Sequence, residues 1–223
     1  MSDIEASDHV LVKVCGLTSV ADALSCAEAG VDWLGLNFYE GSKRRVDQGI
    51  AAEIVASLPG GCEAVGLFVD RPGWEVAETA EKVGLRIVQL HGNETAELMK
   101  ELGHLQVIRA FRIGDHGAIA RMLAYLERAK AVGRTPDAVL VDADVAGEAG
   151  GTGQAIKVGL LDRLPPLPRL ILAGGLTPEN VGERVHRLRP WMVDVASGVE
   201  SSPGRKDAAR VAAFVRAARQ NTI

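Results

Sequence analysis

The sequence predicts a single-domain α/β protein whose parallel strands close into a barrel, and three observations support this. Short runs rich in Val, Ile and Leu alternate with amphipathic helical patterns along the whole chain. No stretch rich in Ser, Pro or Gly interrupts the alternation, as a linker between domains would. About eight strand–helix units fit into 223 residues, which is the size of a lean (β/α)8 or TIM barrel.

Eight segments are expected to be strands, because each is short, apolar and bounded by turn residues. In chain order they are 10–15, 33–38, 63–69, 86–90, 106–111, 137–143, 169–174 and 192–197. Residues 1–9 are expected to form a flexible N-terminal arm ahead of a barrel spanning 10–223. An open doubly wound sheet is the alternative, but the first strand–helix turn, CGLTSV, lacks the GxGxxG fingerprint of dinucleotide-binding folds.

Three helices carry boundary signals in the sequence. SVADALSCAEAG begins with the N-cap candidate Ser19 and closes with Gly30. NETAELMKELG is expected to run from an Asn93 cap to a stop at Gly103. TPENVGERVHRLRP places Thr177 before a proline at the first helical position and ends at a second proline. Crossover helices of this kind fit parallel strands.

Composition limits the partners and the compartment. A formal charge of −4 disfavours nucleic acid as a partner, and no apolar run approaches the roughly 18 residues that span a bilayer. The acidic start MSDIEASDHV does not resemble a secretory signal, so we expect a cytoplasmic protein. No obligate protein partner is evident from the sequence. Three widely spaced cysteines indicate free thiols, with neither a disulfide framework nor a CxxC metal site.

Polar residues interrupt the apolar strands near their carboxyl ends, where barrels carry out their chemistry. Because side chains alternate between the two faces of a strand, one face of each strand points into the barrel. A charge buried there must be paired, neutral or functional. This alternation is expected to turn six side chains inward besides the thiol of Cys15: Lys13, Gln89, His91, Arg109, Asp142 and Asp194. Lys13 and Arg109 are expected to neutralise Asp194, to tune the site, or both.

Cys15 is the one cysteine at a predicted strand end. Buried cysteine is usually small apolar packing, which suits Cys26 and Cys62. A neighbouring cation or helix N-terminus lowers a thiol pKa, and Lys13 and the helix near Ser19 could supply both. Cys15 is therefore the candidate reactive thiol.

Small residues follow the last two predicted strands, in LAGGLTPENV and VASGVESSPGRKD. Barrels often bind phosphate with the loops after strands seven and eight, where backbone amides can approach an anion. Glycines that merely turn the chain are the plainer explanation of either turn taken alone. Both turns together predict a phosphorylated small-molecule ligand bound by Gly174, Gly175, Ser197 and Gly198.

These residues together give the chain a close resemblance to the phosphoribosylanthranilate isomerase family, whose members are eight-fold βα barrels. The resemblance covers almost the full chain, with its motifs in family order and spacing. It rests on KVCGLTSVADAL, GLNFYEGSKRRV, GLFVDRP, VQLHGNE, VDADVAGEAGGTG, LAGGLTPENV and VDVASGVESSPGRKD.

The resemblance implies an Amadori rearrangement in tryptophan biosynthesis, without a metal or redox cofactor. It implies that Asp142 is the general acid that opens the furanose ring and that Cys15 is the general base at C2. Protonated Asp142 and ionised Cys15 are needed at the start, so both pKa values are expected to shift toward neutrality.

The resemblance also implies further contacts with the substrate. Arg44 matches the arginine that contacts the anthranilate carboxylate, with the adjacent Arg45 as the alternative. Asp194 matches a carboxylate near the substrate, while Gly151, Thr152 and Gly153 match the loop after strand six and are expected to bind the phosphate. Gln89 and His91 are also expected to bind the substrate.

The chain departs from the family pattern in two places. Ile156-Lys157-Val158 stands where the family commonly has a Phe-Asp-Trp segment, and Ala173 and Ala196 stand where serine is frequent. Two other functional classes fit the sequence. One is another phosphosugar isomerase or epimerase barrel. The other is a non-catalytic barrel that binds a phosphorylated metabolite or senses oxidants through Cys15.

Overall fold

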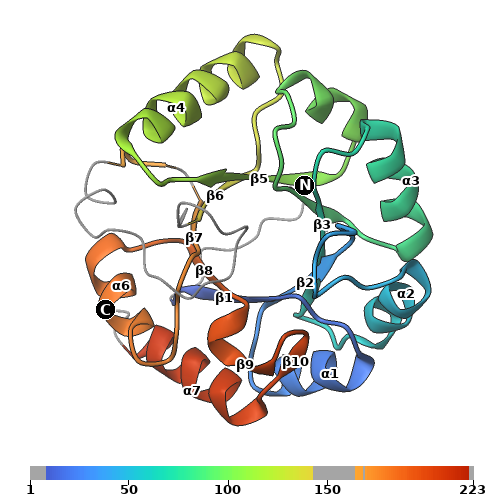
Figure 1. The fold of residues 1–223 in the computed structure, drawn as a ribbon, viewed down its shortest axis with the longest axis vertical. Coiled ribbons are helices and arrows are strands. Elements are labelled where there is room, and N and C mark those ends of the chain that lie inside the picture. Colours follow the sequence, from blue (N-terminus) through green and yellow to red (C-terminus); the bar gives the residue numbers. More distant parts are fainter. Residues whose placement is uncertain (1–8, 143–163, 168, 221–223) are drawn as a thin grey trace.

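The fold is a closed barrel of eight parallel strands, as the sequence predicts. The computed structural model describes residues 9–142, 164–167 and 169–220. The strands follow one another around the barrel in chain order, and β1 closes it by pairing in parallel with β8. Figure 1 shows this ring of strands inside a ring of helices. Closure rules out the open doubly wound sheet.

The observed strands lie within two residues of their predicted bounds at each end. This agreement follows from the short apolar runs, which are buried in every strand. The strands are β1 Leu11–Cys15, β2 Trp33–Asn37, β3 Glu63–Phe68, β4 Ile87–Leu90, β5 Gln106–Arg112, β6 Ala138–Asp142, β7 Leu170–Leu172 and β8 Met192–Val195. Of the predicted arm, only residue 9 is described, so the arm stays a prediction. The segment Ile156-Lys157-Val158 also lies outside the described residues.

Helices and one small hairpin surround the barrel. The α-helices are α1 Val20–Glu28, α2 Gln48–Ser57, α3 Gly73–Val83, α4 His116–Ala131, α6 Val181–Leu188 and α7 Ala208–Arg219. Two 3-10 helices are η1 Glu97–Leu102 and η2 Ser197–Val199, and strands β9 Glu200–Ser202 and β10 Arg205–Lys206 form the hairpin. No helix among the described residues is both long enough and apolar enough to span a membrane.

One helix start was predicted correctly and two were not. The hydroxyl of Ser19 caps α1 by accepting the amide of Asp22 at 3.2 Å. The predicted start at Asn93 is wrong, because the carboxylate of Glu94 accepts the amide of Gly92 and holds this segment as a loop. Only η1 forms, although it does end at Gly103.

The predicted start at Thr177 is also wrong. The side chain of Asn180 accepts the amide of Thr177 at 2.9 Å and donates to the carbonyl of Gly175 at 2.9 Å. These bonds form a turn that precedes the helix, so α6 begins at Val181.

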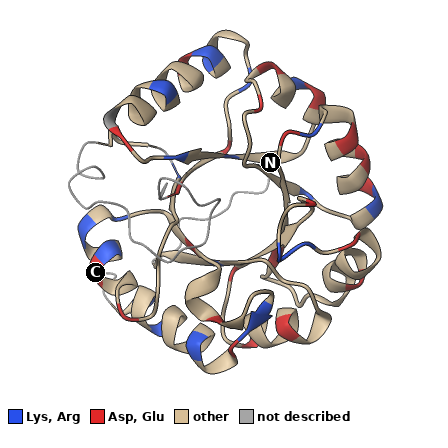
Figure 2. Ribbon diagram, in the orientation of Figure 1, with Lys and Arg blue, Asp and Glu red and all other residues tan. Residues whose placement is uncertain are grey.

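The alternation of side chains along the strands produces two apolar layers. Outward-facing residues such as Val12, Val14 and Val193 pack beneath the helices, and a separate cluster that includes Trp33, Ile108 and Met192 fills the barrel interior. Figure 2 shows charged residues on the outer helices and on the loops around the barrel. The inward-facing polar groups of the described residues lie between the middle of the strands and their carboxyl ends, where the candidate site lies.

The prediction that Arg109 faces the barrel interior is wrong. Strand β5 turns Ile108 and Ala110 inward, so Arg109 faces the helices. Its guanidinium donates to the carbonyls of Leu90 and Gly92 at 2.9 and 3.0 Å, lies 3.3 Å from the carboxylate of Glu94, and faces the rings of Phe111 and Tyr125. Arg109 therefore does not neutralise Asp194.

Candidate active site

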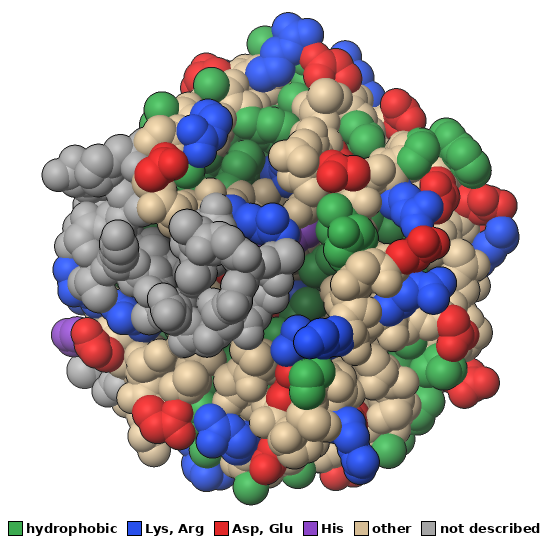
Figure 3. Space-filling view, viewed as in Figure 1, with side chains coloured by type: hydrophobic (Ala, Val, Ile, Leu, Met, Phe, Trp, Pro, Cys, Tyr) green, Lys and Arg blue, Asp and Glu red, His purple; other side chains and the backbone are tan. Residues whose placement is uncertain are grey.

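A cavity of about 470 Å³ opens at the carboxyl ends of the strands. Residues from every strand or the loop after it contribute to its wall. In Figure 3, Lys and Arg side chains border a hollow at the centre of the face shown. The lining residues are Cys15, Asn37, Tyr39, Gly41, Ser42, Lys43, Arg44, Leu67, Val69, Gln89, His91, Arg112, Asp142, Ala173, Gly174, Gly175, Leu176, Asp194, Val195, Ala196, Ser197 and Pro203.

Cys15 ends strand β1 and points into this cavity. Its neighbour on β2 is Gly35, and a Cβ atom there would lie 2.7 Å from the Cys15 sulfur. The missing side chain of Gly35 thus leaves the space that the thiol occupies. The next residue, Gly16, has a φ of +83°, which turns the chain away from the thiol in a conformation that favours glycine.

The thiol is not activated in the way the sequence predicts. Burial raises the pKa of the Cys15 thiol, while the nearby ammonium groups of Lys13 and Lys206 oppose this rise. The expected shift toward neutrality is therefore wrong, because desolvation outweighs the two cations. Cys15 is held as the thiol.

Lys13 pairs with Asp194 deep in the barrel, as the sequence predicts. The Lys13 ammonium lies 3.0 Å from the Asp194 carboxylate, and Lys13 is fully buried. Burial alone would lower the pKa of Lys13, but the Asp194 carboxylate beside it raises that pKa. Burial raises the pKa of Asp194, which Lys13 opposes. Lys13 both balances Asp194 and lies near enough to Cys15 to affect its thiol.

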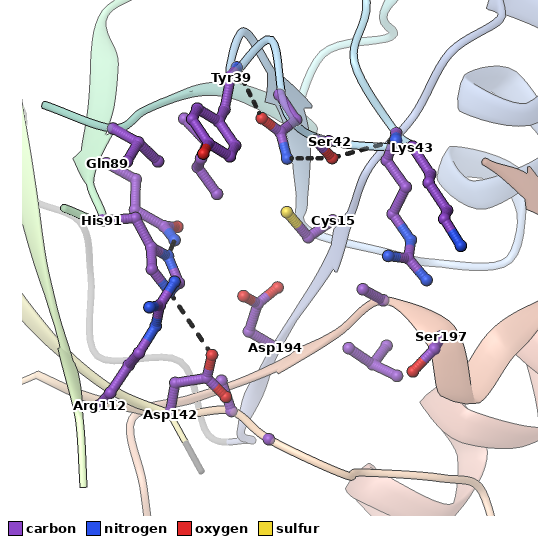
Figure 4. Close-up of a pocket in the computed structure, with 18 of the residues that line it drawn as sticks. Cys15, Tyr39, Ser42, Lys43, Gln89, His91, Arg112, Asp142, Asp194 and Ser197 are labelled. Atoms are coloured by element: carbon purple, nitrogen blue, oxygen red, sulfur yellow. Dashed lines mark hydrogen bonds and ion pairs between the residues drawn. The ribbon is translucent and has the colours of Figure 1, made fainter. Parts of the chain in front are cut away.

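Asp142, at the end of β6, is the centre of a second polar group that includes His91 and Gln89. His91 Nε2 lies 3.5 Å from the Asp142 carboxylate, and Gln89 Nε2 lies 2.8 Å from His91 Nδ1. With the Gln89 amide as donor, the imidazole proton is on Nε2 and faces Asp142. Figure 4 shows the chain Gln89–His91–Asp142 along one side of the cavity.

Gln89 has one further property that suits a ligand site. Its side chain is completely buried, and its Oε1 has no hydrogen-bond partner within the part of the chain that the structure describes. Buried acceptors are normally satisfied. Gln89 lines the cavity, so this oxygen is available to a ligand hydroxyl there.

Arg44, in the loop after β2, lines the cavity, whereas the adjacent Arg45 is exposed and is not part of the wall. The guanidinium of Arg44 is paired with the carboxylate of Glu200 at 2.7 Å. Arg44 rather than Arg45 therefore has the geometry for binding a ligand anion.

The glycine turns after β7 and β8 lie side by side at the cavity. Gly174 and Gly175 have φ of +93° and +63°, and both line the cavity together with Ser197. Gly198 is not part of the wall. A Cβ atom at Gly198 would collide with the backbone carbonyl of Leu176, so this glycine allows the two turns to meet. Gly151, Thr152 and Gly153 lie outside the described residues.

Several wall residues were not predicted. Asn37 follows Trp33 and Gly35 in the inward alternation of β2, and Arg112 follows Ala110 in β5, so the correct phase would have indicated both. Lys43 lies in the KRR run, where only its neighbours were considered. Glu200 and Lys206 of the β9–β10 hairpin are not part of the wall but contact its residues Arg44 and Cys15, and no periodic pattern in the sequence marks them.

A parallel eight-stranded barrel with a thiol, a carboxylate and two glycine turns around one cavity defines a TIM-barrel protein with an enzyme-like site. The family model described as N-(5'phosphoribosyl)anthranilate (PRA) isomerase matches residues 12–217. The chain belongs to this family, which confirms the resemblance seen in its motifs.

Individual relatives agree with this membership. The N-(5'-phosphoribosyl)anthranilate isomerase of Geobacter sulfurreducens is 44% identical over 210 residues, covering 94% of this chain and 98% of the relative. That of Pseudomonas aeruginosa is 45% identical over 213 residues, covering 94% and 95%.

Solved structures show the same relationship. The Thermotoga maritima phosphoribosyl anthranilate isomerase matches with a TM-score of 0.83 and 36% identity, covering 94% of this chain and 98% of that one. A phosphoribosyl anthranilate isomerase in complex with reduced 1-(o-carboxyphenylamino)-1-deoxyribulose 5-phosphate matches with a TM-score of 0.78 and 34% identity, covering 94% and 98%.

Proposed function

We propose that this chain converts N-(5'-phosphoribosyl)anthranilate into 1-(2-carboxyphenylamino)-1-deoxyribulose 5-phosphate, a step of tryptophan biosynthesis. The observation that carries the proposal is the placement of Cys15 and Asp142 in one cavity. They approach it from different sides, with Asp194 between them in Figure 4. Two separate groups are what a reaction with two proton transfers requires.

Asp142 is the general acid in this proposal. It gives its proton to the furanose ring oxygen as the bond between that oxygen and C1 breaks, and the C1–nitrogen bond becomes a Schiff base. The His91 imidazole, 3.5 Å from the Asp142 carboxylate, positions this acid and stabilises the anion that remains. Gln89 fixes the imidazole from its other side, at 2.8 Å.

Cys15 is the general base. Its thiolate takes the proton from C2, and the electrons of that bond form the C1–C2 double bond of an enolamine. The enolamine gains a proton at C1 and loses the hydroxyl proton at C2, which gives the ketone. Because burial favours the thiol form of Cys15, the thiol releases its proton to solvent before this step. Lys13 and Lys206 are the cations that favour the thiolate.

The two ends of the substrate bind on opposite parts of the wall. The phosphate binds to the backbone amides of the turns at Gly174, Gly175 and Ser197, which Gly198 keeps together. The anthranilate carboxylate binds to Arg44. Ala173 and Ala196 provide no hydroxyl group, so the phosphate contacts there come from the backbone.

The three free cysteines suit a reducing compartment, and we place the protein in the cytoplasm on that ground. The experiment that tests the function incubates the purified protein with N-(5'-phosphoribosyl)anthranilate and follows the loss of substrate fluorescence. The product is then identified by NMR from the new C1 methylene group. Phosphate binding without any turnover would favour a non-catalytic barrel instead.

A further inference from the structure

Glu200 is a buried carboxylate outside the groups assigned so far, and it binds two cations at once. It begins the β9–β10 hairpin, and only 4% of its side chain is exposed. One of its oxygens lies 2.7 Å from the ammonium of Lys206, and the pair of oxygens accepts from Nε and Nη2 of Arg44 at 2.7 to 3.1 Å. A bidentate pair of this kind fixes a guanidinium in direction as well as in distance.

The contacts of Arg44 leave one edge of its guanidinium for a ligand. Nε and Nη2 donate to the carboxylate of Glu200. Nη1 donates no hydrogen bond to any residue in the described part of the chain. The aliphatic stem lies over Gly16, where an added Cβ would be 2.6 Å from Arg44 Cδ. The backbone amide of Arg44 donates to the hydroxyl of Ser42 at 3.0 Å. Arg44 is thus held along its whole length.

Lys206 connects this pair to the barrel itself. Its ammonium donates to the carbonyl of Cys15 at 2.6 Å and to that of Ala196 at 3.4 Å, and its side chain is 2% exposed. The hairpin is also tied to the first loop, because the hydroxyl of Thr18 donates to the carbonyl of Gly204 at 2.7 Å. The position of Glu200 is therefore fixed relative to the end of strand β1.

The charges of this cluster suit the binding of an anion. Two cations and one carboxylate leave one positive charge beside the cavity. Burial alone would raise the pKa of Glu200, but its bonds to Arg44 and Lys206 lower it. The bond to Glu200 also raises the pKa of Arg44. Both directions favour the charged forms of Glu200 and Arg44, and Glu200 offsets only part of the positive charge that a ligand carboxylate would meet.

We propose that Glu200 is a positioning residue that orients Arg44 toward the carboxylate of the substrate's aromatic ring. This proposal rests on the role assigned to Arg44 in the proposed function. The hairpin that follows β8, anchored by Lys206 to the strand that bears Cys15, then sets the distance between the carboxylate-binding group and the base. Recognition of the ring carboxylate depends on Glu200 even though Glu200 does not touch the substrate.

The test compares two stable ligands that differ only in that carboxylate. They are the reduced product, 1-(2-carboxyphenylamino)-1-deoxyribitol 5-phosphate, and the same compound with an unsubstituted phenyl ring. Calorimetry gives the Kd of each ligand for the wild type and for Glu200→Gln. The measured quantity is the Kd of the phenyl compound divided by the Kd of the carboxyphenyl compound. This ratio isolates the contribution of the carboxylate.

We expect Glu200→Gln to reduce this ratio about tenfold, the equivalent of one charge-assisted hydrogen bond, while the Kd of the phenyl compound stays close to that of the wild type. The matched control is Glu78→Gln on α3, which makes the same chemical change at the exposed 2.7 Å pair between Glu78 and Lys82. Its ratio should equal that of the wild type.

A ratio in Glu200→Gln within about twofold of the wild type would overturn the inference. This includes the case in which both ligands weaken equally, as general loosening of the fold would cause. Arg44→Met separates this failure from a failure of the proposed function. If Arg44→Met also leaves the ratio unchanged, the role assigned to Arg44 is wrong.

Glu200→Asp keeps the test available should the glutamine variant fail to fold. It retains the negative charge that Lys206 and Arg44 require, but it is one methylene shorter and cannot keep both bonds at their present lengths. The same fall in the ratio is expected. An unchanged ratio in a folded Glu200→Asp protein would count against the inference equally.

Discussion

The ammonium of Lys13 and the carboxylate of Asp194 form a 3.0 Å ion pair between the paired strands β1 and β8, and both residues are buried. Lys13 lies two residues before Cys15 on β1, on the same inward face. The pair therefore supports the fold and contributes to the electrostatic surroundings of the thiol. These two effects can be separated by experiment.

Replacing Lys13 with Met should destabilise the protein strongly. The change leaves the Asp194 carboxylate buried without its partner, and removing one member of a buried pair costs about 3–5 kcal/mol. Chemical denaturation of the wild type and of Lys13→Met measures this loss. The double variant Lys13→Met/Asp194→Asn should lose less than the sum of the two single variants, because no lone charge remains. Additive losses would show that the two side chains do not stabilise each other.

The pH dependence of the reactivity of Cys15 toward an alkylating reagent should reflect the buried thiol. Burial raises the pKa of Cys15, and only the thiolate reacts with such a reagent. We therefore expect the alkylation rate of Cys15 to be still rising at about pH 8.5, the ordinary pKa of a thiol. A rate that levels off below about pH 7 would show that Cys15 is already a thiolate. Cys62→Ser, which changes a thiol outside the cavity wall, should leave the profile unchanged.

Adding one methyl group at Gly198 should weaken phosphate binding. The Cβ of Gly198→Ala would meet the carbonyl of Leu176, so the turns after β7 and β8 must move apart. Strain of this kind costs about 1–3 kcal/mol, and we expect the inhibition constant of inorganic phosphate to rise about tenfold. Gly60→Ala is the control, because nothing lies within 4 Å of a Cβ there. An unchanged constant in Gly198→Ala would mean that the contact between the turns does not matter for phosphate.

The strands and most of the inward-facing residues could be predicted because a barrel strand combines an apolar run with strict alternation. Arg109 shows where this reasoning fails. The alternation along β5 was assigned with the wrong phase, so Arg109 was expected to face the barrel interior, whereas Arg112 is the β5 arginine that lines the cavity. Local hydrogen bonds were a second source of error. The side chains of Glu94 and Asn180 accept hydrogen bonds from nearby backbone amides, and the helices that follow begin later in the chain than predicted.

The contacts of Arg44 could not be predicted from sequence periodicity. Its partner Glu200 is far from it in the chain, and the β9–β10 hairpin that brings them together has no repeating pattern. The pKa of Cys15 was mispredicted for a related reason. The sequence shows the cation at Lys13 but not how deeply the thiol is buried, and burial has the larger effect.

The roles of Cys15 and Asp142 are the central claim, and the rate of substrate fluorescence loss in Cys15→Ala and Asp142→Asn tests them most directly. Loss of a general base or acid typically costs about 10²–10⁴-fold in rate, so we expect each variant to lose at least about 100-fold in kcat. Both variants should still bind the reduced product with a Kd close to that of the wild type. Retention of most of the wild-type kcat by either variant would contradict the role assigned to that residue.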